Sequence, residues 1–222
     1  MDLCKMIKKI RILTTEKCQC ESAELVGFFL HITKAVDYQQ AFKDQCIVCV
    51  FAYEYSYRGA RFYIVSEIDH FLHLYFAVPF QYRYFYEILP LNRPYKLFFD
   101  FDFIGNTKEG TKFDRLFRAA AAHIRWIAHS MIDSSQIDDM HYTLLTANKQ
   151  DKISYHAIFC DRVTFPNIMY VSKFVEKLAM RVNPGLQLWD NSVYKPNRNF
   201  RVLFSTKRKC WRPLSIAYFI MG

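Results

Sequence analysis

The stretch Tyr95-Lys-Leu-Phe-Phe-Asp-Phe-Asp-Phe103 determines how the fold of this chain is interpreted. Side chains alternate between the two faces of a β-strand, so every second residue from Tyr95 shares one wholly apolar face that belongs in a core. Asp100 and Asp102 share the opposite face, about 6.5 Å apart at the backbone. Two acids on one face repel each other unless a cation lies between them, and oxygen ligands suit Mg²⁺ or Mn²⁺. The alternative interpretation is two acids on a solvated edge strand.

The segment Lys152-Ile-Ser-Tyr-His156 has the same period of two. Lys152, Ser154 and His156 share one face, and they are donors of the kind that a triphosphate needs. A Ser–His pair also suggests nucleophilic hydrolysis. However, a spacing of two along a strand is wrong for a proton relay, and no G-x-S-x-G motif occurs.

A third segment, Asp190 to Lys207, contains the only acid after residue 180. Asp190 is either an ion-pair partner or a third metal ligand. We expect Arg201, Leu203, Ser205 and Lys207 on one strand face, with Arg198 in the preceding turn. Guanidinium groups bind phosphate bidentately. No Walker A or Rossmann glycine pattern is present, so side chains would bind the phosphate.

Composition supports a folded protein with an anionic partner. The 222 residues carry a net charge of +9, and 52% are hydrophobic, which excludes intrinsic disorder. Residues 181–222 hold eight basic side chains against one acid, so the basicity is concentrated there. Arg208, Lys209 and Arg212, with the basic N-terminus, are candidates for contacts to a nucleic-acid backbone.

The seven cysteines are irregularly spaced, which favours a reducing compartment over a disulfide framework. Cys46 and Cys49, with Cys18 and Cys20, have the residue types of a zinc site, but the segment around Cys49 has the pattern of a buried strand. No zinc is therefore expected. No apolar run is long enough for a transmembrane helix, so no membrane association is expected.

Apolar spacing and turn residues predict the other elements. We expect helices at 21–44, from Ser66 to about Phe76, from Thr111 to about Met131 and at Asn167–Arg181. We expect strands at Ile47–Tyr55, Arg61–Val65, Arg83–Leu89, His141–Ala147, Ile153–Cys160 and Phe200–Phe204. This mixture indicates an α+β fold with a mostly antiparallel sheet.

Together, D-x-D, S-x-H and a distant Asp follow the motif order of the archaeo-eukaryotic primase superfamily, which this chain resembles over about residues 36–210. The motif sequences most resemble those of the primase-polymerase branch. K-x-S-x-H lies at 152–156, and D-x-x-V-Y-x-x-N-R-N-F-R at 190–201 is followed by Lys207. The resemblance implies one primase catalytic core, with an N-terminal α/β module over about 1–90 and an RRM-like catalytic module over about 91–222.

By this resemblance, the activity is template-directed nucleotidyl transfer that makes or extends primers on single-stranded DNA in replication or damage tolerance. Asp100, Asp102 and Asp190 would be catalytic and hold two Mg²⁺ or Mn²⁺ ions. The implied nucleotide contacts are Lys152, Ser154, His156, Arg198, Arg201 and Lys207. Expected partners are the template, ribonucleoside or deoxynucleoside triphosphates, and an accessory primase subunit or helicase. The expected location is intracellular, in the nucleus or a virus's host nucleus, with the mitochondrion left open.

The chain also departs from that branch. The primase-polymerase branch usually has D-x-E, whereas this chain has D-x-D at 100–102. No C-terminal zinc-binding domain is expected, because Cys210 is the only cysteine in the tail. The compact length also resembles the short primases of large DNA viruses, including the baculovirus type. A catalytically inactive single-stranded DNA-binding subunit is the alternative function, although the intact acids argue against it. A metal-dependent phosphodiesterase is a third hypothesis, which KISYH and NRNFR disfavour.

Overall fold

The computed structural model describes residues 27–42, 48–104, 130, 142–147, 152–159, 164–182 and 189–220. The chain divides into two compact units. Unit 1 comprises Met1–Pro90 and Asn199–Pro213, and unit 2 comprises Leu91–Arg198 and Leu214–Gly222. Residues 199–213, expected in the C-terminal module, thus group with unit 1. Both units combine helices with antiparallel strand pairs, which confirms the α+β class.

Unit 1 is built on a five-stranded sheet in the order β1-β3-β2-β4-β8. Its elements are β1 (Gly27–Phe29), α2 (Ile32–Ala41), β2 (Val48–Glu54), β3 (Arg61–Glu67), α3 (Ile68–Ala77), the 3-10 turn η2 (Phe80–Tyr82), β4 (Phe85–Leu89) and β8 (Arg198–Arg201). The β2–β3 pair is the expected hairpin, with Gly59 at its turn. A φ of +84° there favours glycine, because a side chain would strain that conformation.

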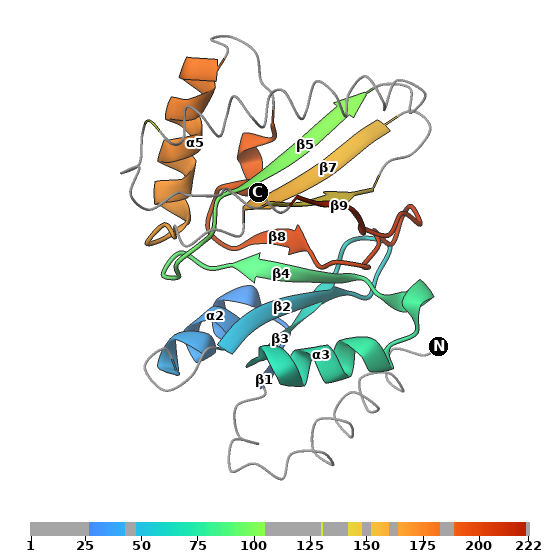
Figure 1. The fold of residues 1–222 in the computed structure, drawn as a ribbon. Helices are drawn as coiled ribbons and strands as arrows, with labels where there is room; N and C mark the ends of the chain where they lie inside the picture. The colour runs from blue at the N-terminus through green and yellow to red at the C-terminus, as the bar shows by residue number, and fades with distance from the viewer. Residues whose placement is uncertain are drawn as a thin grey trace. The chain divides into compact units, whose positions relative to one another are not determined.

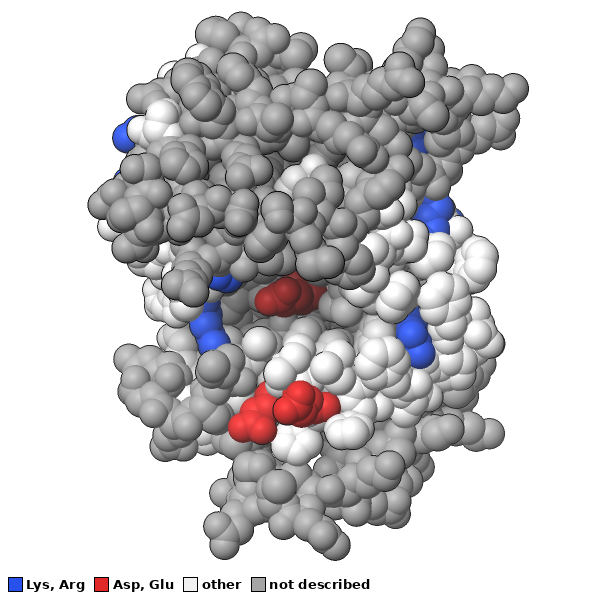
Figure 2. Space-filling model, viewed as in Figure 1, with Lys and Arg blue, Asp and Glu red and all other residues white. Residues whose placement is uncertain are grey.

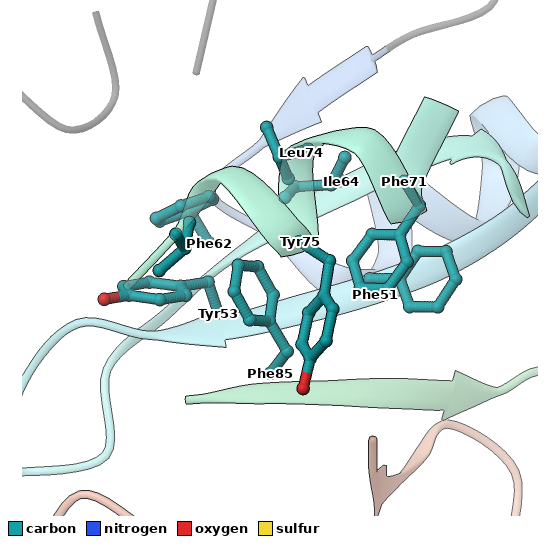
Figure 3. Close-up of a cluster of buried hydrophobic side chains, with 9 residues drawn as sticks. Phe51, Tyr53, Phe62, Ile64, Phe71, Leu74, Tyr75 and Phe85 are labelled. Atoms are coloured by element: carbon teal, nitrogen blue, oxygen red, sulfur yellow. The ribbon is translucent and has the colours of Figure 1, made fainter. Parts of the chain in front are cut away.

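Both faces of the unit 1 sheet are apolar, and each is covered by one helix. On one face, Phe51 and Tyr53 of β2 pack with Phe71 and Tyr75 of α3 (Figure 3). The Phe51 and Phe71 rings stack with centroids 3.4 Å apart. On the other face, alternate residues of the same strand pack with α2 in a cluster of small apolar side chains. A sheet covered on both faces explains why β2 is an almost unbroken apolar run.

Two expectations for unit 1 are wrong. The helix predicted over 21–44 begins only at Ile32, because Gly27–Phe29 instead pairs with β3 as a short edge strand. Its apolar residues satisfied a helical spacing and a strand equally well. The helix expected from Ser66 begins two residues later, at Ile68. Glu67 is the N-cap, and the Ser66 hydroxyl donates to the Glu67 carbonyl because β3 extends to that residue.

Unit 2 contains a four-stranded sheet in the order β5-β7-β6-β9 (Figure 1). All three strand pairs are antiparallel. Its elements are β5 (Phe98–Ile104), β6 (Tyr142–Thr146), β7 (Lys152–Phe159), α5 (Ile168–Val182), the 3-10 turn η5 (Asn191–Val193) and β9 (Ser215–Ile220). The two strands and the helix expected between 141 and 181 are confirmed, whereas no strand was expected at β9. The helix expected from Thr111 lies outside the described residues, except for Ser130.

The last expected strand, Phe200–Phe204, differs from the strand in the structure. β8 ends at Arg201, and Phe204 lies in a turn with a φ of +62°. Arg201, Leu203, Ser205 and Lys207 therefore do not share one strand face. The hydroxyl of Tyr75 donates to the Leu203 carbonyl, and this contact holds the turn against α3 within unit 1. None of the helices in the described part of the chain has the length and apolarity to cross a membrane.

Candidate active site

The pairing of β5 with β7 brings two of the sequence motifs onto one face of the unit 2 sheet. Asp100 lies opposite His156, and Asp102 lies opposite Ser154. Directly opposite residues of an antiparallel pair point to the same side of the sheet. Lys152 continues that face, because it is two residues from Ser154. All five motif residues of β5 and β7 thus project from one side.

The hydrogen-bonding pattern between β5 and β7 brings these side chains close together. Phe159 N donates to Leu97 O across the two strands, so Leu97 and Phe159 form a hydrogen-bonded pair. Counting along the ladder makes Asp100–His156 and Asp102–Ser154 non-hydrogen-bonded pairs, which are the closer type at about 4.5 Å between α-carbons. The Asp100 carbonyl therefore points away from β7, toward the free edge of β5.

The polar side chains on this face lie in two close pairs. The Asp100 Oδ1 and His156 Nε2 atoms are 3.4 Å apart, and the Lys152 ammonium donates to the Asp102 carboxylate at 2.7 Å. Ser154 and His156 are both buried, at 4% exposed. Burying an imidazole and a hydroxyl costs free energy unless they are bonded, so their burial needs polar partners on the same face. The Asp100 carboxylate is the acidic group that lies within ion-pair distance of His156.

The opposite face of β5 is core, as its sequence predicted. Phe99 and Phe101 are buried, and the indole of Trp189 packs against both rings, with centroids 4.9 and 6.3 Å away. Phe159 of β7 adds an edge-on contact to Phe99. The apolar side therefore fixes the position of β5, and with it the direction in which Asp100 and Asp102 project.

Asp190 reaches the same strand through the backbone. Its amide donates to the Asp100 carbonyl at 2.8 Å, on the free edge of β5. Its carboxylate accepts from the amide and the hydroxyl of Ser192, at 2.8 and 2.9 Å, and so caps η5. The structure thus brings the third predicted acid next to the first. An Asp two residues before a Ser is a familiar Asx-turn pattern, so the sequence carried a signal for this cap.

Tyr194 is a residue that the sequence reasoning missed. Its buried ring packs against Phe98, and its hydroxyl donates to the Phe98 carbonyl at 2.8 Å. Burial raises the pKa of Tyr194 well above its usual value, and the nearby Asp100 and Asp190 charges act in the same direction. With Trp189 on one face of β5 and Tyr194 on the other, the segment 189–194 wraps around the strand edge that carries Asp190.

The predicted basic residues do not all belong to this unit. Arg198 is exposed and is the first residue of β8, so the expectation that it lies in the preceding turn is wrong. It follows Asn197, whose φ of +60° turns the chain into β8. Arg201 belongs to unit 1, where it is buried and donates from Nη1 to the Arg212 carbonyl at 3.1 Å. Lys207 also belongs to unit 1 and is exposed.

The three weaker candidates for nucleic-acid contacts lie in unit 1 as well. Arg208 is half-buried, Lys209 is exposed, and the Arg212 amide donates to the Thr206 hydroxyl at 2.6 Å. Among the described residues visible in Figure 2, the Lys and Arg side chains form separate small groups. The net charge by itself therefore does not define a binding surface.

The donor chemistry of the acidic face suits a hard divalent cation, because Asp100 and Asp102 offer carboxylate oxygens from one side of one strand. Their present partners are His156 and Lys152, and a cation would compete with the Lys152 contact. Among the residues that the structure describes, no three His, Cys, Asp or Glu side chains are grouped as ligands of one ion. Of the four thiols considered for zinc, only Cys49 in β2 is described.

No protein-family model matches this sequence, and comparison with curated proteins finds no significant match.

Proposed function

We propose that this chain is a template-directed nucleotidyltransferase, a DNA primase or primase-polymerase that makes or extends primers on single-stranded DNA. The observation that carries the proposal is the shared face of β5 and β7. Two acids, an imidazole, a hydroxyl and an ammonium lie together there, and the backbone of a third acid is bonded to the same strand. This set combines ligands for a cation with donors for phosphate.

The connectivity of unit 2 supports the proposed RRM-like module. After β5, the β6–β7 pair places β7 between β5 and β6, and the chain passes through α5. It then returns to the free edge of β5 at Asp190. The β-α-β-β-α-β order of ferredoxin-like modules contains this strand pair, this helix and a final strand, and it has another helix after the first strand. Residues 105–129, at that position, lie outside the described part of the chain.

In this proposal, Asp100, Asp102 and Asp190 hold divalent ions, Mg²⁺ or Mn²⁺. When bound, such ions lower the pKa of an attacking hydroxyl and stabilise a leaving pyrophosphate. Lys152 would exchange its contact with Asp102 for a triphosphate oxygen. His156, held 3.4 Å from Asp100, would donate to a phosphate and is not assigned the role of base. Arg198, Arg201 and Lys207 remain predicted triphosphate contacts from the resemblance.

The test is synthesis by the full chain on a single-stranded template with labelled nucleotides and Mg²⁺ or Mn²⁺. Product on template alone indicates priming, and product only with an annealed primer indicates extension. Asp100→Asn should abolish synthesis, whereas Asp37→Asn, an exposed acid on α2, should not. Titration calorimetry with Mn²⁺ gives a second readout, because Asp100→Asn should weaken metal binding. Template retention without synthesis by the unaltered chain would favour the inactive DNA-binding subunit.

A further inference from the structure

Three segments of unit 1 that are far apart in sequence meet at one end of its sheet. They are the β2–β3 turn, the connection from α3 to β4, and the chain after β8. The Tyr53 hydroxyl donates to the Tyr82 carbonyl at 3.1 Å, and Thr206 N donates to Arg83 O at 2.8 Å. Figure 1 shows β2 ending, β4 beginning and β8 ending at this same end.

This end of the sheet exposes aromatic rings. Tyr57 is 66% exposed and Trp211 is 63% exposed. Phe80 is 39% exposed, and its ring meets that of Trp211 edge-on at 6.1 Å. Scattered exposed apolar residues need no explanation, but several rings brought together from three segments indicate a binding surface.

The rings are combined with an arginine that lies over two of them. The Arg208 guanidinium lies over the rings of Tyr57 and Tyr84, at 4.7 and 5.0 Å from their centroids. Within the described residues, Arg208 forms no ion pair. No Asp or Glu occurs in residues 55–60, 76–84 or 202–213. These three segments carry the cations Arg58, Arg83, Lys207, Arg208, Lys209 and Arg212.

We infer that the set Tyr57, Phe80, Tyr84, Arg208 and Trp211, here called the aromatic–arginine surface, binds single-stranded nucleic acid by base stacking. Exposed rings stack on unpaired bases of any sequence, and arginines add phosphate contacts and cation–π contacts. The excess of basic over acidic residues in these three segments favours a polyanion over a protein partner. A duplex hides its base faces, so a single strand fits these rings better. The inference does not depend on nucleotidyl transfer.

The experiment measures binding of labelled 30-mers to the full chain by fluorescence anisotropy. The probes are oligo(dT), oligo(U), a duplex and an abasic oligonucleotide with the same phosphate charge. Binding should be tightest for the single strands with bases, and oligo(dT) against oligo(U) separates a DNA from an RNA preference. Equal affinity for the abasic probe would overturn base stacking, and no binding to either single strand would overturn the inference altogether.

Single substitutions locate the binding. Tyr57→Ala and Trp211→Ala should each weaken oligo(dT) binding about five-fold or more, whereas Tyr57→Phe should retain it. The matched control is Tyr170→Ala, an exposed ring on α5 of unit 2. Arg208→Ala should also lower the log–log salt slope by about 0.7, and Lys177→Ala should not. If Tyr57→Ala and Trp211→Ala bind like the unaltered chain, the surface is wrongly assigned.

Two further outcomes separate this inference from others. If the Tyr57 and Trp211 variants change the oligomeric state in light scattering while retaining oligo(dT) binding, the surface contacts a second copy of the chain and the inference fails. Asp100→Asn should bind oligo(dT) normally. An unaltered chain that binds oligo(dT) through these residues but makes no product would overturn the proposed function and leave this inference standing.

Discussion

The two sheets use their faces differently. In unit 1, Val48–Tyr53 of β2 are apolar, with α3 packed on one side and α2 on the other, and the acid at the end of the strand, Glu54, pairs with Arg61. In unit 2, one side of β5 is equally apolar, but the other carries Asp100 and Asp102 opposite His156 and Ser154. The first arrangement maximises buried apolar surface, which is the dominant favourable term in folding.

The second arrangement gives up some of that stabilisation. Ser154 and His156 are as buried as core residues, yet they are polar, and a buried polar group contributes to stability only when it is bonded. Apolar residues would fill these positions at lower cost. The proposed function assigns the acids, the imidazole and the ammonium on this sheet face a chemical role. Substitutions in the two units should separate these two roles.

The largest expected effect is on synthesis. Asp100→Asn should lower nucleotide incorporation by on the order of 10³-fold, because a neutral amide replaces a proposed metal ligand worth several kcal/mol. Primer extension with Mg²⁺ measures the loss. Thermal unfolding should show a native-like transition in the same variant. If Asp100→Asn lowers the unfolding temperature but its folded fraction incorporates nucleotides at the normal rate, Asp100 is a structural residue.

In unit 1 we expect the largest effect of a substitution to be on stability instead of on synthesis. Phe71→Ala should lower the free energy of unfolding by about 3–5 kcal/mol, because it opens a cavity beneath the stacked Phe51 ring. Chemical denaturation monitored by fluorescence gives the value. Phe76→Ala, on the same helix but 59% exposed, is the matched control and should change stability little. Equal effects of the two substitutions would contradict the assigned core.

Tyr194→Phe should have an intermediate effect on unit 2. It removes the hydrogen bond to Phe98 O, which contributes about 0.5–1.5 kcal/mol. Because burial raises the folded-state pKa of Tyr194 above the ordinary value of 10.0, stability is retained below pH 10 and falls as the pH rises further. The variant should show a shallower decline above pH 10 in urea titrations. An unchanged slope would mean that Tyr194 does not contribute to this decline.

The smallest effect on stability is expected at Lys152. The ion pair with Asp102 is partly exposed, with both side chains 29% accessible, so Lys152→Ala should cost less than about 1 kcal/mol. If Lys152 binds a triphosphate as proposed, the same variant should raise the KM for nucleotides while Lys173→Ala on α5 does not. A large loss of stability with an unchanged KM would make Lys152 a structural residue.

Much of the secondary structure was predictable because local spacing determined it. The alternation in Phe99–Asp102, the turn at Gly59 and the apolar spacing of α5 each match the structure closely. The failures occur where local patterns fit two outcomes. Phe28 and Phe29 suit a helix or a strand, and the choice depends on pairing with β3. The end of β8 at Arg201 depends on the turn that Tyr75 holds.

The sequence by itself determined which residues share a face within each strand, because the period of a strand is a local property. Asp100 with Asp102, and Ser154 with His156, follow from spacing alone. Only the tertiary structure decided that these two sets lie on the same face, because strand register joins residues more than fifty positions apart. It also decided that Asp190 bonds to the edge of β5, and that Arg208 lies over Tyr57 and Tyr84. Such contacts depend on the closure of long loops, which no local pattern specifies.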